Sequence, residues 1–93
     1  MFDVNEYFDG NVKSLAFTAG EDKATIGVMA AGQYKFGTNT IEHMTLISGE
    51  MSIMLPDEDT WRDVAINETF IVAADTSFLV KLACDSAYLC LYK

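Results

Sequence analysis

The segment GQYKFGTNTIEHMTLISG, residues 32–49, carries the most specific pattern in this 93-residue chain. Two short runs with β-forming residues, Gln33–Phe36 and Met44–Ile47, lie in it between glycine-containing turn signals. The turn at Ser48-Gly49 leads into Met51–Leu55, which makes a natural hairpin partner. Because no apolar stripe recurs with the 3.6-residue period of a helix, the stretch predicts antiparallel strands.

The same pattern extends outward in both directions from this stretch. Further strands are predicted at Val12–Phe17, Ala24–Ala30, Trp61–Ala65, Phe70–Val72, Ser77–Ala83 and Ala87–Tyr92. About nine strands at spacings near ten residues are typical of a small barrel or sandwich. With no linker or repeat, residues 1–93 are expected to form one all-β domain. Strand spacing alone leaves a jelly roll, an immunoglobulin-like sandwich and an OB barrel open.

The charge balance argues against two classes of partner. Fourteen acidic residues face six basic ones, which never cluster: Lys13, Lys23, Lys35, Arg62, Lys81 and Lys93. A nucleic-acid binder needs a basic stripe against phosphates, and an anionic membrane surface also attracts basic groups. The N-terminus lacks the features of a signal peptide, and no apolar run reaches membrane-spanning length. We therefore expect a cytoplasmic protein that binds neither nucleic acid nor membrane.

The two cysteines, Cys84 and Cys90, lie in an apolar stretch near the C-terminus. Six residues apart on one strand, they would be separated by roughly 20 Å, too far for a disulfide bond without an intervening turn. We therefore predict two buried, reduced thiols.

The segment of residues 32–49 also resembles the first motif of the cupins. In that motif a glycine precedes His-x-His, and a glutamate is followed seven residues later by a glycine, as are Glu42 and Gly49 here. The two histidine positions hold Phe36 and Thr38, and the histidine position of the second cupin motif falls at Phe78. The resemblance implies a cupin-like jelly-roll barrel. Since three of four metal-ligand positions are unsuited to metal, we predict no metal and no other cofactor.

A closer resemblance covers nearly the whole chain. The segments NEYFDGNVKSLAF, GVMAAGQYKFGT, EHMTLISGEMSIMLPD and SAYLCLY resemble the small cupin family of pyrimidine/purine nucleoside phosphorylases. The resemblance implies cleavage of purine and pyrimidine nucleosides, with inorganic phosphate as co-substrate, to free base and ribose 1-phosphate. It also implies a homodimer, which fits the modest core that so short a chain can bury.

Candidate site residues follow from strand alternation combined with the cupin pattern. Tyr34, Phe36 and Thr38 should share one face if the chain is extended, and the cupin pattern places that face inside the barrel with Glu42 and Phe78. We predict Glu42 as the catalytic carboxylate, because positive charge develops on the ribose in the transition state. The other four residues are predicted to bind substrate, although simple core packing is an alternative for each ring.

The sequence offers few basic side chains that could bind phosphate. Lys13 with Ser14, in a segment that resembles the family, is the first candidate for binding it, and Arg62 or turn amides are the second. Lys35 is expected to face away from the rings beside it, and His43 away from the barrel. A non-catalytic metabolite-binding cupin remains the alternative function, since cupin folds host many activities.

Overall fold

The protein was analysed as a computed structural model in which residues 2–93 are described. Within that range the chain forms ten strands and no helix, which confirms the prediction of an all-β fold. The strands are β1 (Val4–Tyr7), β2 (Val12–Ala19), β3 (Asp22–Met29), β4 (Gly32–Gly37), β5 (Glu42–Ser48), β6 (Met51–Met54), β7 (Arg62–Val64), β8 (Thr69–Val72), β9 (Ser77–Leu82) and β10 (Ser86–Tyr92).

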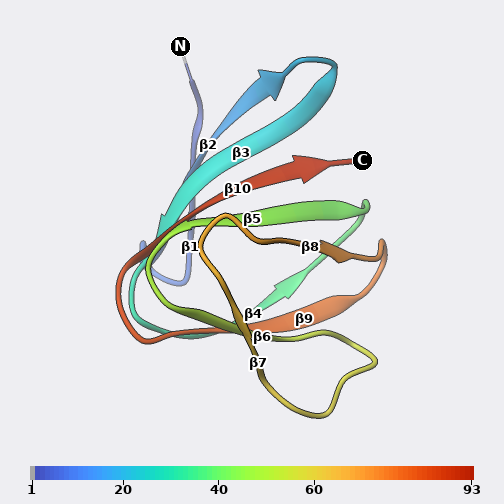
Figure 1. Ribbon diagram of the computed structural model, residues 1–93. Coiled ribbons are helices and arrows are strands. Elements are labelled where there is room, and N and C mark those ends of the chain that lie inside the picture. The colour runs from blue at the N-terminus through green and yellow to red at the C-terminus, as the bar shows by residue number, and fades with distance from the viewer. Residues whose placement is uncertain (1) are drawn as a thin grey trace.

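The strands build two facing sheets (Figure 1). The larger has the order β1-β2-β3-β10-β5-β8 and the smaller the order β4-β9-β6-β7. All their pairings are antiparallel. The chain crosses between the sheets repeatedly, so β10 lies between β3 and β5 although it comes last. The two sheets are not joined into one closed barrel, and this leaves room for an opening between them.

Alternate residues of the central strands fill the space between the sheets, as the pleat requires. Leu46 of β5, Ile53 of β6 and Val80 of β9 are fully buried there. Each such side chain contributes about 1.5–3 kcal/mol through burial of apolar surface. This packed core holds the sheets together at the end of β5 that carries Leu46.

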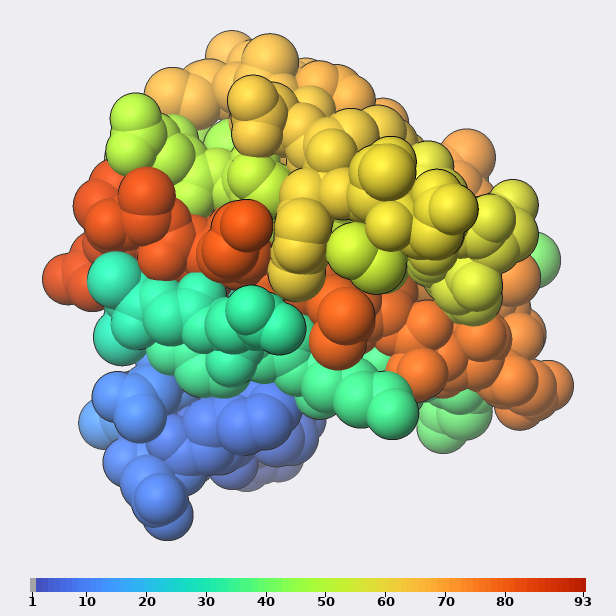
Figure 2. Space-filling view, turned by 90° about the horizontal axis from the view of Figure 1, so that it is seen from below, coloured from blue at the N-terminus to red at the C-terminus, as the bar shows by residue number. Residues whose placement is uncertain are grey.

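Strand β1 is a difference from the sequence-based expectation. It pairs only with β2, with Val4 opposite Leu15 and Tyr7 opposite Val12. Because it is an edge strand with mostly exposed side chains, it lacks the apolar alternation that makes other strands visible in the sequence. Its turn into β2 brings the N-terminal segment beside the teal residues near position 30, as Figure 2 shows.

The cysteine prediction is half right. Both thiols are free, and Cys90 is buried in β10. Cys84 is exposed, because β9 ends at Leu82 and the residues up to Asp85 form the connection to β10 rather than a strand. The described residues include no helix with the length and hydropathy of a membrane span.

The glycine of the cupin-like motif has a clear steric role. Gly49, in the turn between β5 and β6, has a φ of 110°, a conformation that residues with a side chain rarely adopt. A Cβ at this position would overlap the Ser86 side chain at the start of β10. Glycine at residue 49 therefore lets the β5–β6 turn fold closely over the neighbouring strand.

Candidate active site

A cavity of about 340 Å³ opens between the two sheets. This lies near the lower end of the range of small-molecule sites, roughly 300–1,000 Å³. Its lining comes from strands of both sheets (β1, β2, β3, β4, β5, β9 and β10) and from loops beside them: Tyr7, Phe8, Ser14, Met29, Lys35, Phe36, Gly37, Asn39, Glu42, Met44, Phe78, Tyr88 and Tyr92. One carboxylate, several hydroxyls and a wall of rings therefore meet in one hollow, and Lys35 borders it.

Glu42 is the acidic residue of this lining. It is the first residue of β5 and is only 8 % exposed. Burial raises the pKa of its carboxyl, and a hydrogen bond from Cys90 acts in the opposite direction. The Cys90 Sγ lies 3.6 Å from Glu42 Oε1 and is the donor. Since a thiol is a weak donor, Glu42 retains capacity to accept hydrogen bonds from a bound molecule.

Cys90 stays in its neutral form. Burial first, and then the neighbouring Glu42, raise the pKa of its thiol to about 12. The thiol therefore keeps its proton at neutral pH and remains a donor toward the carboxylate. Tyr92, two residues along β10, also has a raised pKa, chiefly because of burial, and its hydroxyl lies 2.9 Å from Thr25 Oγ1.

Tyr88 completes the polar side of the cavity. Burial raises the pKa of its phenol, and a hydrogen bond with Ser14 partly offsets this. Its ring crosses directly beneath β3, where a Cβ on Gly27 would lie 2.8 Å from the Tyr88 hydroxyl and 2.7 Å from the Lys13 carbonyl oxygen. The absence of a side chain at Gly27 thus gives Tyr88 its place in the wall.

The opposite wall is a row of aromatic rings. Phe36 and Phe78 are cross-strand partners on β4 and β9, with ring centroids 5.8 Å apart. Phe70 lies 6.2 Å beyond Phe78, deeper in the core. Tyr34 and Phe8 join the row at its outer end, 6.1 and 5.5 Å from Phe36. The row therefore runs from the packed core to the cavity mouth.

The structure brings four of the seven predicted site residues together in the lining. Glu42, Ser14, Phe36 and Phe78 meet there. Tyr34 lies behind Phe36, buried, and its hydroxyl donates to the Ala30 carbonyl oxygen at 2.7 Å.

Thr38 and Lys13 lie outside the lining. Strand β4 ends at Gly37, so alternation does not extend to Thr38. The Thr38 hydroxyl instead donates to the Ala73 carbonyl at 2.7 Å and accepts from the Thr76 amide at 3.1 Å, tying two loops together. Lys13 faces the other side of β2 and pairs with Glu6 at 3.4 Å.

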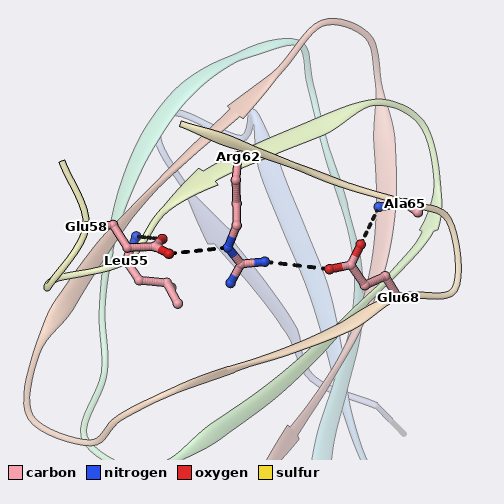
Figure 3. A network of polar contacts seen from close by, with 5 residues as sticks. All are labelled: Leu55, Glu58, Arg62, Ala65 and Glu68. Atoms are coloured by element: carbon pink, nitrogen blue, oxygen red, sulfur yellow. Dashed lines mark hydrogen bonds and ion pairs between the residues drawn. The ribbon is translucent and has the colours of Figure 1, made fainter. Parts of the chain in front are cut away.

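Arg62, the second candidate for phosphate binding, is committed elsewhere. Its Nε lies 3.4 Å from Glu58 and its Nη1 3.6 Å from Glu68 (Figure 3). Glu58 also accepts from the Leu55 amide, and Glu68 from the Ala65 amide. Arg62 therefore links the loops on either side of β7 through two carboxylates that would repel phosphate.

Lys35 is the basic residue that borders the cavity, and its exposed side chain alternates with those of Tyr34 and Phe36 along β4, as predicted. Strand alternation placed it opposite Phe36, yet it lies close enough to the strand's end for its residue to border the opening. Within residues 2–93, the ion pairs involve Lys13, Arg62 and Lys93, and none involves Lys35. Lys35 is therefore available to an anion.

Side chains of β10, none of which was among the predicted site residues, form the polar floor of the cavity. Tyr88 and Tyr92 line it, and Cys90 between them contacts Glu42. The signal was present in the alternation of Tyr88, Cys90 and Tyr92. It gained meaning only once β10 was known to pair with β5, with Tyr92 opposite Glu42.

The residues at the cupin metal positions do not fit a metal ion. Phe36 and Phe78 have no donor atom, and the Thr38 hydroxyl is used between loops. In the described part of the chain, no three His, Cys, Asp or Glu side chains are grouped as a metal site. The fold and the site together define a cupin-type sandwich whose cavity is lined by one carboxylate and aromatic rings.

Comparison with known proteins identifies the family. The family model described as pyrimidine/purine nucleoside phosphorylase matches residues 2–92. A curated protein of that name from Pseudomonas syringae is 55 % identical over 93 residues, covering all of both chains. The chain therefore belongs to the pyrimidine/purine nucleoside phosphorylase family.

Solved structures agree on the fold. A Vibrio parahaemolyticus protein of unknown function superposes with a TM-score of 0.94 at 35 % identity, covering 100 % of this chain and 99 % of the other. A cupin-2 domain protein from Rhodospirillum rubrum gives a TM-score of 0.76 at 11 % identity, covering 97 % of this chain and 68 % of the other. The cupin-like jelly-roll prediction is thereby confirmed.

Proposed function

We propose that this protein cleaves purine and pyrimidine nucleosides with phosphate, and that the reaction takes place in the cavity around Glu42. The observation that carries the location is a buried carboxylate facing an open, ring-lined hollow. A buried carboxylate whose side-chain partner is one weak thiol donor is costly for folding alone. Such groups gather at functional sites, where a ligand supplies the missing interactions.

The reaction assigns a role to each wall of the cavity. A phosphate oxygen forms a bond to the ribose anomeric carbon while the bond from that carbon to the base nitrogen breaks. The electron pair leaves with the base, which then takes up a proton. Glu42 stabilises the positive charge that develops on the ribose, an interaction that strengthens in a partly desolvated site. The base packs against the aromatic wall.

Lys35 is the best candidate for binding phosphate, because it borders the cavity and makes no ion pair among residues 2–93. The hydroxyls of Ser14, Tyr88 and Tyr92 add donors on the opposite side. Lys13, favoured by sequence, is held by Glu6 outside the lining. Lys35 therefore replaces Lys13 as our candidate.

We also propose a homodimer that forms through the outer face of the six-stranded sheet. Val4, Leu15, Ile26 and Leu89 stand in register across four strands of this face. The first three are exposed although apolar. The row is uncharged, so two copies with a net charge of −8 each can approach there without placing like charges against each other.

Sedimentation equilibrium of the wild type and of Ile26→Lys tests this interface. An unchanged dimer in the variant would place the interface elsewhere.

The cytoplasmic location remains part of this proposal. Two free thiols, one of them exposed, are in keeping with a reducing compartment.

The activity test uses purified protein with adenosine or uridine. Base and ribose 1-phosphate should appear with inorganic phosphate and not without it, in samples treated with a chelator or left untreated. Thermal stabilisation by nucleosides with no product in either condition would instead favour a binding protein. Product that requires an added metal ion would contradict the proposed chemistry.

A further inference from the structure

The turn between β1 and β2 has an unusual backbone. Phe8, Asp9 and Gly10 have φ values of 54°, 57° and 85°, and the Gly10 amide donates to the Tyr7 carbonyl at 3.2 Å. Two central residues with positive φ are the mark of a type I′ turn, which favours Asn-Gly. A bulky side chain in this region is an outlier, so Phe8 is held in a strained conformation.

The strain is not explained by burial of the Phe8 ring. Phe8 as a residue remains 43 % exposed, whereas Phe78 and Tyr34 in the same aromatic row are 2 % and 7 % exposed. A residue retained for core packing would hide its ring. Strained residues that stay accessible gather at ligand sites, where the strain positions a functional group.

The ring is aimed at the cavity mouth. Phe8 and Tyr7 both line the cavity, on the same turn. The Phe8 centroid lies 4.9 Å from that of Tyr34, and it meets Phe36 edge-to-face at 5.5 Å with an interplanar angle of 86°. In Figure 2 the blue N-terminal segment carrying this turn lies directly against the segment that leads into β4. Two buried or half-buried rings thus fix Phe8 from behind.

Accessibility separates the rings into two groups. Phe78 and Phe70 are closed off within the core, whereas Phe36 and Phe8 of the row retain surface for a bound molecule, as does the neighbouring Tyr7, which is 50 % exposed. A planar base that enters this end of the cavity can therefore stack on the accessible ring of Phe8. Every nucleobase has a π-face, so stacking on an aromatic side chain tolerates purines and pyrimidines alike.

We propose that Phe8 is a nucleobase-stacking residue that gives the site affinity for bases of both classes. This inference rests on the proposed function, and it adds a residue from the β1–β2 turn to the site. Ribose and phosphate contacts remain with the groups deeper in the cavity.

The test compares three variants by steady-state kinetics with adenosine and with uridine. Phe8→Leu keeps apolar bulk but removes the ring, and should raise KM for both nucleosides about tenfold, equivalent to about 1.4 kcal/mol, while KM for phosphate stays within about twofold. Phe8→Trp should restore nucleoside KM. Asp9→Asn, an exposed change in the same turn and outside the cavity lining, is the matched control and should behave as wild type.

Thermal melting separates folding from binding. If Phe8→Leu has lowered stability, kinetics are measured well below its Tm, and the phosphate KM serves as the internal reference. Equal nucleoside KM in wild type and Phe8→Leu overturns the proposal. A rise in the KM for phosphate as large as the rise in the KM for nucleosides also overturns it. If the wild type lacks turnover, the proposed function fails, and calorimetric binding of adenosine and uridine to the same variants then decides the role of Phe8 alone.

Discussion

Strand β5 begins in the cavity and ends in the packed core, and its two ends obey different rules. Glu42, Met44 and Leu46 point to the same side of the sheet, as alternation requires. At Glu42 the facing space is open, polar and bordered by Tyr92 of β10. At Leu46 it is filled and apolar, and the side chain is completely buried. One strand thus separates a region that maintains the fold from a region available for chemistry.

The largest effect is expected at the core end. Leu46→Ala should lower the free energy of unfolding by about 2–5 kcal/mol, because it leaves a void between two rigid sheets. At a temperature where the variant is folded, kcat should remain near that of the wild type. Urea unfolding combined with the phosphorolysis assay measures both. Ile47→Ala, an exposed neighbour on the opposite face, is the control and should change stability by about 0.5 kcal/mol or less.

The cavity end should behave in the opposite way. Glu42→Gln should reduce kcat/KM tenfold or more, because it removes the charge but little of the volume. A Leu46-like loss of stability with full activity would show that Glu42 belongs to the core after all. Glu50→Gln, on an exposed residue of the β5–β6 turn, is the matched control.

The same variant has a pH signature. Folding raises the pKa of Glu42, so the native state holds this proton more tightly than the unfolded chain does. The group therefore favours folding at low pH, and this contribution is lost as pH rises through the folded pKa. Glu42→Gln should accordingly melt at a higher temperature than wild type at pH 8, with the gap closing toward pH 4. A gap that widens on acidification would contradict the burial argument.

A smaller effect is expected for the lysine proposed to bind phosphate at the cavity rim. Lys35→Met should raise KM for phosphate about fivefold, the loss of one charge-assisted contact at a solvent-exposed position. Lys13→Met, whose lysine pairs with Glu6, serves as the control and should leave that KM unchanged. A reversal, with Lys13 decisive and Lys35 neutral, would restore the sequence-based assignment. Initial rates at varied phosphate and saturating nucleoside measure both values.

The smallest effect concerns the thiol beneath the carboxylate. Cys90→Ala removes the hydrogen bond that lowers the pKa of Glu42, so the acidic limb of the pH–rate profile should move to higher pH, with kcat at its plateau within about threefold of wild type. Cys84→Ala, at the exposed thiol, should leave the profile in place. An unmoved profile in Cys90→Ala would mean that the thiol only fills space.

The fold could largely be predicted from the sequence, because two signals mark most strands: the alternation of apolar residues and the turn residues between strands. Strand β1 escaped since an exposed edge strand has no buried face to mark it. Glu42, Phe36, Phe78 and Ser14 were placed in the cavity by pattern and resemblance. Thr38 was misplaced because alternation was carried one residue past the end of β4. Lys35, Tyr88 and Phe8 depend on pairing and turn geometry between distant segments, which no local pattern contains.

The contrast between the two cysteines makes the molecule convenient to observe. A thiol reacts as its thiolate, so Cys90, buried and with a pKa near 12, is nearly inert at neutral pH. Cys84 is exposed in the connection before β10, while Glu42 faces the far end of that same strand. A maleimide dye would therefore attach at a single place in the unmutated protein, away from the cavity.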